Sequence, residues 1–115
     1  MVRHMENNLD SAFHALADPT RRAVIGRLMA GPAAVTELAS PFGIGLPTFL
    51  KHLRVLEEGG WIRSEKRGRV RTCHVRPERL LAAERWLAEQ RAVWDARTDR
   101  LADYVEKHMA AKDSR

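Results

Sequence analysis

The sequence has one cysteine, few aromatic residues and no long apolar run. Cys73 stands alone, so an internal disulfide framework is excluded. No apolar stretch approaches the ~20 residues of a membrane-spanning helix, and no signal peptide is visible, which predicts a cytoplasmic protein without membrane contact. We find no metal-ligand cluster, no glycine-rich phosphate loop and no nucleophile with a spaced base. An enzyme is therefore the weakest hypothesis, and no metal or cofactor is expected.

The composition that remains is typical of one soluble globular domain. The 115 residues are 44% hydrophobic and 30% charged, which suffices for a real core but is short for an elaborate active-site cleft. Residues 1–8 are expected to be disordered or in part a cloning remnant. Residues 9–109 are expected to form the domain, and residues 110–115 to fray.

The net charge of +5 is confined to one short segment. Residues 1–61 carry six basic and six acidic groups, and residues 77–115 carry eight of each. Residues 62–76 carry six basic groups against Glu65 alone. Because each phosphate neutralised by a cation releases condensed counterions, this segment predicts a polyanionic partner. The alternative is that these charges only solvate the surface.

A helix with one apolar side is expected over residues 46–58. A short helix over residues 37–42, which Thr36 can cap, and a glycine turn at residues 43–45 precede it, in the outline of a helix-turn-helix. The opposite side of helix 46–58 stays free to touch a partner. The residues at helical spacing that are expected to face the core are Phe49, Leu53 and Leu56.

Two more helices are expected before this pair. The first spans residues 9–17, and the second begins at Pro19 with Asp18 as its N-cap. It carries Val24, Ile25 and Leu28 inward. Arg21 and Arg22 follow the cap; one could meet a DNA backbone and the other an acidic neighbour.

The basic segment reads as a β-hairpin. Strands are expected over residues 61–66 and 69–75, around a tight turn at Arg67-Gly68. A helix with a free basic side next to a basic ribbon suits double-stranded DNA, since a helix fits the major groove and a ribbon can follow the backbone or the minor groove. Arg63 and Arg71 are alternatively expected to pair with Glu65.

Individual DNA contacts follow from these positions. Lys51 and Arg54 project from the outer side, where they can reach bases or phosphates. Pro47 and Thr48 lie at the helix N-terminus, which favours a phosphate. For His52, a phosphate hydrogen bond and a packed structural role both remain open. The expected DNA-binding residues are Pro47, Thr48, Leu50, Lys51, His52, Arg54, Arg67 and Arg69.

A helix of ~30 residues is expected from Pro77 onward. Its apolar residues recur every seven positions at Leu80, Leu87, Trp94 and Leu101, and Tyr104 and Val105 extend the stripe. One protomer has too little surface to cover such a stripe, which predicts a two-fold dimer. The alternative is that the stripe packs on its own domain.

The motifs together resemble those of a known family. An A-D-P-T-R-R run ends at Arg22, T-E-L-A spans residues 36–39, and K-H-L-R-V-L-E-E spans residues 51–58 before the basic hairpin. In this order, over about residues 9–105, they resemble the ArsR-type winged helix-turn-helix transcriptional regulators. The resemblance implies a mainly α fold with a small β-hairpin (α+β), with about five helices and a two-stranded wing.

The same resemblance implies a homodimer that binds a pseudo-palindromic operator, with the first and last helices at the dimer interface. The residues expected in that interface are Leu9, Phe13, Leu87, Trp94, Leu101 and Val105.

The sequence departs from this family where metal-sensing members bind their ions. Many carry a Cys-x-Cys pair in the third helix, but residues 37–41 contain no thiol here. Others use paired Asp and His ligands on the last helix, where His108 is the only histidine. The resemblance therefore implies a branch without the usual metal sites. Leu50 stands where Ser or Thr is common, and it suits a thymine methyl contact.

The main hypothesis is a sequence-specific, homodimeric DNA-binding repressor. Helix 46–58 would read the major groove, and the wing over residues 61–75 would contact the backbone or the minor groove. The alternative is a protein-interaction module that uses the long last helix, which monomeric behaviour without DNA affinity would favour. The sequence names neither the operator nor an effector, and oxidation at Cys73 is one of several open signals.

Overall fold

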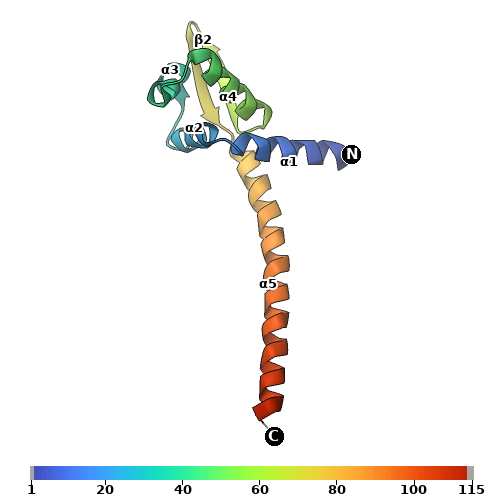
Figure 1. Cartoon of the computed structure of the whole chain (residues 1–115). Coiled ribbons are helices and arrows are strands. Elements are labelled where there is room, and N and C mark those ends of the chain that lie inside the picture. Colours follow the sequence, from blue (N-terminus) through green and yellow to red (C-terminus); the bar gives the residue numbers. More distant parts are fainter. Residues whose placement is uncertain (1, 114–115) are drawn as a thin grey trace. The chain divides into compact units, whose positions relative to one another are not determined.

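The computed structural model describes the backbone of residues 2–113 and the side chains of residues 9–110. Its elements (Figure 1) are α1 (Val2–Leu16), α2 (Pro19–Met29), β1 (Ala33–Ala34), α3 (Val35–Ala39), the 3-10 turn η1 (Ser40–Phe42), α4 (Leu46–Glu58), β2 (Ile62–Arg67), β3 (Val70–Val75) and α5 (Pro77–Asp113). This confirms the predicted winged helix-turn-helix architecture. The chain forms two compact units, one ending at Ala83 and one beginning at Glu84.

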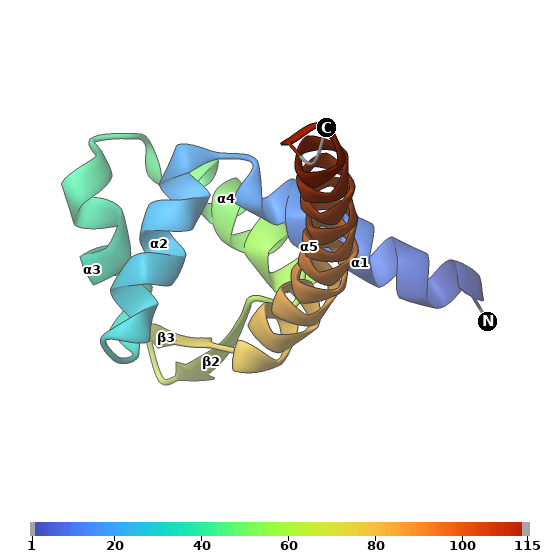
Figure 2. The same ribbon diagram turned by 90° about the horizontal axis from the view of Figure 1, so that it is seen from below.

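The first unit is built around α4, which packs against α1, α2 and β2 (Figure 2). The strands form one antiparallel sheet in the order β1-β3-β2. At the start of α4, the Phe49 ring stacks on Phe42 with the ring centroids 5.6 Å apart. The helical residues predicted to face the core are buried, namely Val24, Ile25, Leu28, Phe49, Leu53 and Leu56.

The C-terminus of α4 shows how a local turn directs the core. The amide of Gly60 donates to the Glu57 carbonyl and that of Trp61 to the Leu56 carbonyl, both at 3.0 Å. Gly60 adopts a φ of 77°, which completes a Schellman motif that a side chain would strain. The turn carries Trp61 into the core, where its Nε1–H donates to the Ala12 carbonyl of α1 at 2.8 Å.

The segment between α2 and α4 differs from the prediction. α3 begins at Val35 after Ala34, with no side-chain cap, so the expectation that Thr36 caps this helix was wrong. Ala33–Ala34 instead pairs with β3, with Ala33 opposite Cys73. Because this short strand leads directly into α3, the chain direction is set by sheet pairing rather than by a capping side chain.

The hairpin turn lies one residue later than predicted. Arg67 pairs with Val70, so Gly68 and Arg69 form the two-residue loop. Gly68 has a φ of 62°. In the described chain, only glycines have a positive φ, so that of Arg69 is negative. A positive φ at the first loop position alone matches a type II′ turn, which suits the twist of a hairpin. Arg69 therefore lies at the tip of the wing.

Both terminal helices are longer than expected. α1 begins at Val2 rather than near Leu9, although the side chains of residues 1–8 lie outside the described ones. α5 has 37 residues and continues to Asp113. The tail expected at residues 110–115 therefore falls partly in α5 and partly outside the described residues. None of the helices in the described part of the chain combines the length and apolar character of a membrane span.

Candidate nucleic-acid interface

The side of α4 that faces away from the core is open. Leu50, Lys51 and Arg54 are exposed there, as the helical spacing predicted. No described residue engages the Lys51 or Arg54 side chain in a hydrogen bond or ion pair. At the N-terminus of the helix, Pro47 and Thr48 are exposed and no side chain caps the first turn. Pro47 has no N–H, so the amides of Leu46 and Thr48 are donors that this first turn can offer to a phosphate.

His52 lies in a half-buried cluster on the flank of the same helix. Its Nδ1 is 3.2 Å from Nη1 of Arg21 and 3.8 Å from Oδ2 of Asp18. A guanidinium only donates, so in a neutral ring Nδ1 accepts and the proton is on Nε2, whereas a charged ring would attract Asp18 instead. Burial acts to raise the pKa of Asp18, but the Arg21 amide and the His52 and Arg21 charges outweigh it and lower that pKa. The packed role left open for His52 is therefore present, and its phosphate contact stays a prediction.

The guanidinium groups of Arg21 and Arg22 cap the C-terminal end of α1. Arg21 donates from Nε to the Ala15 carbonyl at 2.7 Å and from Nη2 to the His14 carbonyl at 3.1 Å. Arg22 donates from Nη1 to the Leu16 carbonyl at 2.7 Å. The last carbonyls of a helix lack partners within it and carry partial negative charge, which these cations satisfy. The Arg21 charge also lowers the pKa of Asp18, so Arg21 has the acidic neighbour expected for one of the two arginines, and the DNA contact expected for the other stays a prediction.

The outer side of the wing carries one internal ion pair and two open cations. Nη1 of Arg63 lies 2.7 Å from Oε1 of Glu65, which confirms that predicted pair. This hydrogen bond, together with the charge of Arg63, lowers the pKa of Glu65. Oε2 of Glu65 also lies 3.8 Å from Nε2 of His74. Arg67 and Arg69 are exposed, and no described residue gives their side chains a hydrogen bond or ion pair.

Arg71 faces the other way, so the expectation that it pairs with Glu65 was wrong. Glu65 lies opposite Thr72 in the hairpin register, and Lys66 lies opposite Arg71. Since successive residues of a strand point to opposite faces, Arg71 shares its face with Lys66 rather than with Glu65. Lys66 and Arg71 are not among the predicted DNA contacts, although strand alternation across the hairpin would have placed these two cations on one face.

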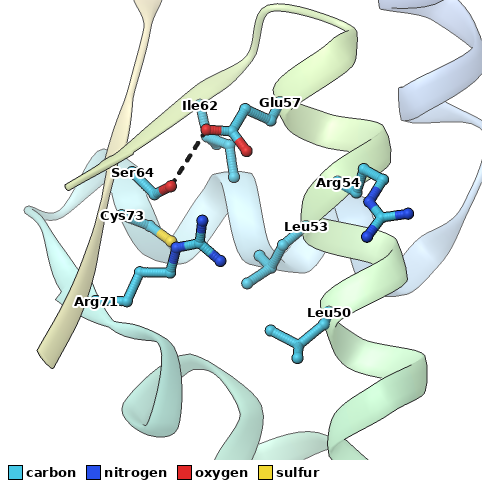
Figure 3. A pocket seen from close by; sticks show the side chains of 8 residues that line it. All are labelled: Leu50, Leu53, Arg54, Glu57, Ile62, Ser64, Arg71 and Cys73. Carbon is cyan, nitrogen blue, oxygen red and sulfur yellow. Dashed lines mark hydrogen bonds between the residues drawn. The ribbon is translucent and has the colours of Figure 1, made fainter. Parts of the chain in front are cut away.

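A cleft lies between α4 and this inner side of the wing. Figure 3 shows Leu50 and Leu53 pointing from α4 toward the strands, and Arg71 extending from β3 toward the helix. The hydroxyl of Ser64 donates to Oε1 of Glu57 at 3.2 Å. The residues that line the cleft are Leu50, Leu53, Arg54, Glu57, Ile62, Ser64, Arg71 and Cys73.

The second unit is helical throughout its described residues, and its apolar side chains are exposed. The four interface candidates on α5 are open, with Trp94 64% and Leu101 62% exposed. Leu9 and Phe13 of α1, in the first unit, are half-buried. Polar contacts within α5 are local, such as the Arg91–Asp95 pair at 3.6 Å. Helical structure alone therefore does not cover the apolar stripe. The candidates on α5 are Leu87, Trp94, Leu101 and Val105.

The described residues contain no group of three or more His, Cys, Asp or Glu side chains that could hold a metal ion. Cys73 is a free, buried thiol. Burial raises its pKa, the Glu57 charge raises it further, and Arg71 acts in the opposite direction. A buried thiol with a raised pKa is a weak nucleophile, so its first role here is to pack the base of the cleft.

Comparisons with known proteins agree with this geometry. The helix-turn-helix domain family matches residues 16–65, which include α2 to α4 and part of β2. The HTH-type transcriptional regulator Rv2034 of Mycobacterium tuberculosis is 40% identical over 73 residues, which are 64% of this chain and 68% of that protein. The transcriptional repressor SdpR of Bacillus subtilis is 30% identical over 60 residues, which are 52% of this chain and 67% of that protein.

Solved structures are similar to this chain as well. One is the crystal structure of an ArsR family transcriptional regulator, whose sequence is 58% identical and whose TM-score is 0.74, over 76% of this chain and 91% of that one. A homodimeric winged helix-turn-helix DNA-binding domain from Mycobacterium bovis has a TM-score of 0.61 at 24% identity, over 81% and 83% of the two chains, and shows the fold alone. With α4 exposed on one side and a basic wing, the chain belongs to the ArsR family of winged helix-turn-helix, DNA-binding transcriptional regulators.

Proposed function

We propose that this regulator binds a DNA operator as a homodimer and represses transcription there. The observation that carries the proposal is the set of cations that have no partner among the described residues, on one side of α4 and at the wing tip. Lys51 and Arg54 would enter the major groove, and Arg67 and Arg69 would hold the backbone or the adjacent minor groove. Repression is supported by the relative that is named a repressor.

The remaining expected contacts fit the same pose. The Thr48 amide at the start of α4 offers a phosphate a donor at the positive end of the helix. Leu50, which is 39% exposed, offers an apolar surface to a thymine methyl group. With its proton on Nε2, His52 can donate to a phosphate while Nδ1 stays bonded to Arg21.

The dimer is supported by the exposed stripe on α5 and by the homodimeric neighbour of the same fold. A stripe that carries Trp94 and Leu101 is costly to leave in water, since burying such a side chain is worth about 1.5–3 kcal/mol. We propose that a second copy covers it, together with Leu9 and Phe13 of α1. Two copies would then present two α4 helices to successive turns of the duplex.

Fluorescence anisotropy with fragments of the gene's own promoter tests this function. We expect one fragment to bind far more tightly than random duplex of equal length, with an affinity that falls steeply as salt is raised. Sedimentation equilibrium should report a dimer. If every promoter fragment bound no better than random duplex, the hypothesis that the protein regulates its own promoter would be wrong. A monomer without DNA affinity would favour the protein-interaction module instead.

A further inference from the structure

The cleft between α4 and the wing combines an unpaired cation with an apolar floor. Leu53, Ile62 and Cys73 form the floor and are buried. The Arg71 side chain extends toward α4 beside Cys73 (Figure 3), and no described residue engages its guanidinium in a hydrogen bond or ion pair. Because a guanidinium stays charged at every relevant pH, the cleft favours an anion that also has an apolar part.

The opposite end of the cleft limits the charge of such an anion. Glu57 lies there as the acceptor for the Ser64 hydroxyl, and its carboxylate repels a second negative group. Burial and Glu57 also raise the pKa of Cys73, so the thiol stays neutral and the floor stays apolar. Arg54 also lines the cleft, but its side chain points away from Arg71 (Figure 3). A single negative charge therefore fits at the Arg71 end only, with the uncharged body of the ligand between α4 and the sheet.

We propose that this cleft binds a small monocarboxylate with an apolar body, and that its binding weakens DNA binding. The cleft holds about 190 Å³, which is below the roughly 300 Å³ at which pockets for drug-sized ligands begin, so the ligand is small. The carboxylate pairs with Arg71 side-on, as guanidinium geometry favours. The apolar body contacts Leu53 and Ile62.

The link to DNA follows from shared residues. Leu50 and Arg54 line the cleft and also belong to the open side of α4. A ligand in contact with them competes with insertion of the helix into the major groove. This competition rests on the proposed function, whereas binding of the ligand to the free protein does not.

Benzoate is a suitable probe, with benzamide as its uncharged isostere. In an NMR titration of the whole chain without DNA, benzoate should shift the amides of Ser64, Arg71 and Cys73. Its affinity should be in the millimolar to high-micromolar range, as expected for few atoms in an open site. Benzamide should bind at least ~10-fold more weakly, because it lacks the charge. Arg71→Gln should abolish benzoate binding, whereas the matched tip variant Arg69→Gln should retain it.

Two further arms separate the outcomes. Benzoate should weaken promoter binding by the wild type but not by Arg71→Gln. If inorganic phosphate bound as tightly as benzoate, the cleft would be a general site for backbone phosphates, and the proposal would be overturned. Unchanged benzoate binding by Arg71→Gln would overturn it as well. Normal benzoate binding without any promoter binding would instead contradict the proposed function.

Discussion

The arginines at the α1–α2 junction have hydrogen-bond partners within the fold, whereas those at the tip of the wing have none among the described residues. Arg21 and Arg22 donate to three backbone carbonyls at the end of α1, while Arg67 and Arg69 have no hydrogen-bond or ion-pair partner among the described residues. A guanidinium that donates to carbonyls keeps its charge, but its position and some of its donors are fixed by the fold, which leaves it less free to follow a phosphate. The contrast predicts that DNA contacts come from the cations without partners among the described residues rather than from every basic residue.

The largest expected effect is the loss of the Arg21 side chain. Arg21→Met should destabilise the fold by about 2–4 kcal/mol, because charge-assisted hydrogen bonds contribute roughly 1.5–3 kcal/mol each and are not additive here. Urea unfolding of the whole chain measures this change. The matched variant Arg69→Met should stay within about 0.5 kcal/mol of the wild type, as exposed sites do. Equal losses in the two variants would break the comparison.

Next in size is the effect of an open cation on α4. Arg54→Ala should weaken binding to the preferred promoter fragment by about 1–3 kcal/mol, or roughly 5- to 150-fold, if its guanidinium reads a base edge. Binding to random duplex should change much less, and the unfolding midpoint should be unchanged. Anisotropy on both duplexes measures the ratio. An equal loss on both would place Arg54 on a phosphate instead of a base.

A smaller and less selective effect is expected at the wing tip. The double variant Arg67→Gln, Arg69→Gln should weaken binding to promoter and random duplex alike. Because each neutralised phosphate adds ~0.9 to the salt dependence, the slope of log affinity against log salt should fall by about 2. Measurements over several salt concentrations give this slope. An unchanged slope would mean that the tip cations only solvate the surface.

The sequence predicted those parts of the fold that depend on neighbours in the chain. The i, i+4 spacing of Phe49 and Leu53 was enough to find the buried side of α4, and Asp18 was enough to begin α2. The open positions of Lys51 and Arg54 followed from the same spacing. The roles of these cations on DNA stay predictions, since no described contact tests them.

The parts that were missed depend on segments brought together by folding. β1 has two residues, too few to show an alternating pattern, and it is a strand only because β3 lies beside it. The partners of Arg21 are carbonyls of another helix, which leave no mark in the sequence around it. The pairing expected for Arg71 was an error of a different kind, because strand alternation puts Arg71 on the face of Lys66 and not of Glu65 with the loop at either position.

The smallest expected effect concerns two carboxylates, one at the α1–α2 junction and one on the wing. The pKa values of Asp18 and Glu65 are both lowered in the fold. A lowered pKa contributes stability above the carboxyl's ordinary pKa, and this contribution is lost as pH falls through the folded value. Asp18→Asn keeps an N-cap acceptor but loses the charge, so its deficit against the wild type should be present near neutral pH and vanish in acid.

Glu65→Gln is the control on the wing. The Glu65 side chain is exposed, so water and salt screen its pairing with Arg63, and the variant should show a smaller deficit than Asp18→Asn near neutral pH and none in acid. Urea unfolding of both variants at about pH 7 and about pH 2.5 measures the two deficits. If the Asp18→Asn deficit persisted unchanged in acid, the lost interaction would be the geometry of the cap and not its charge. The charge of Asp18 would then add nothing to the stability of the α1–α2 junction. The contrast between the junction and the wing would rest on the Arg21 and Arg22 hydrogen bonds alone.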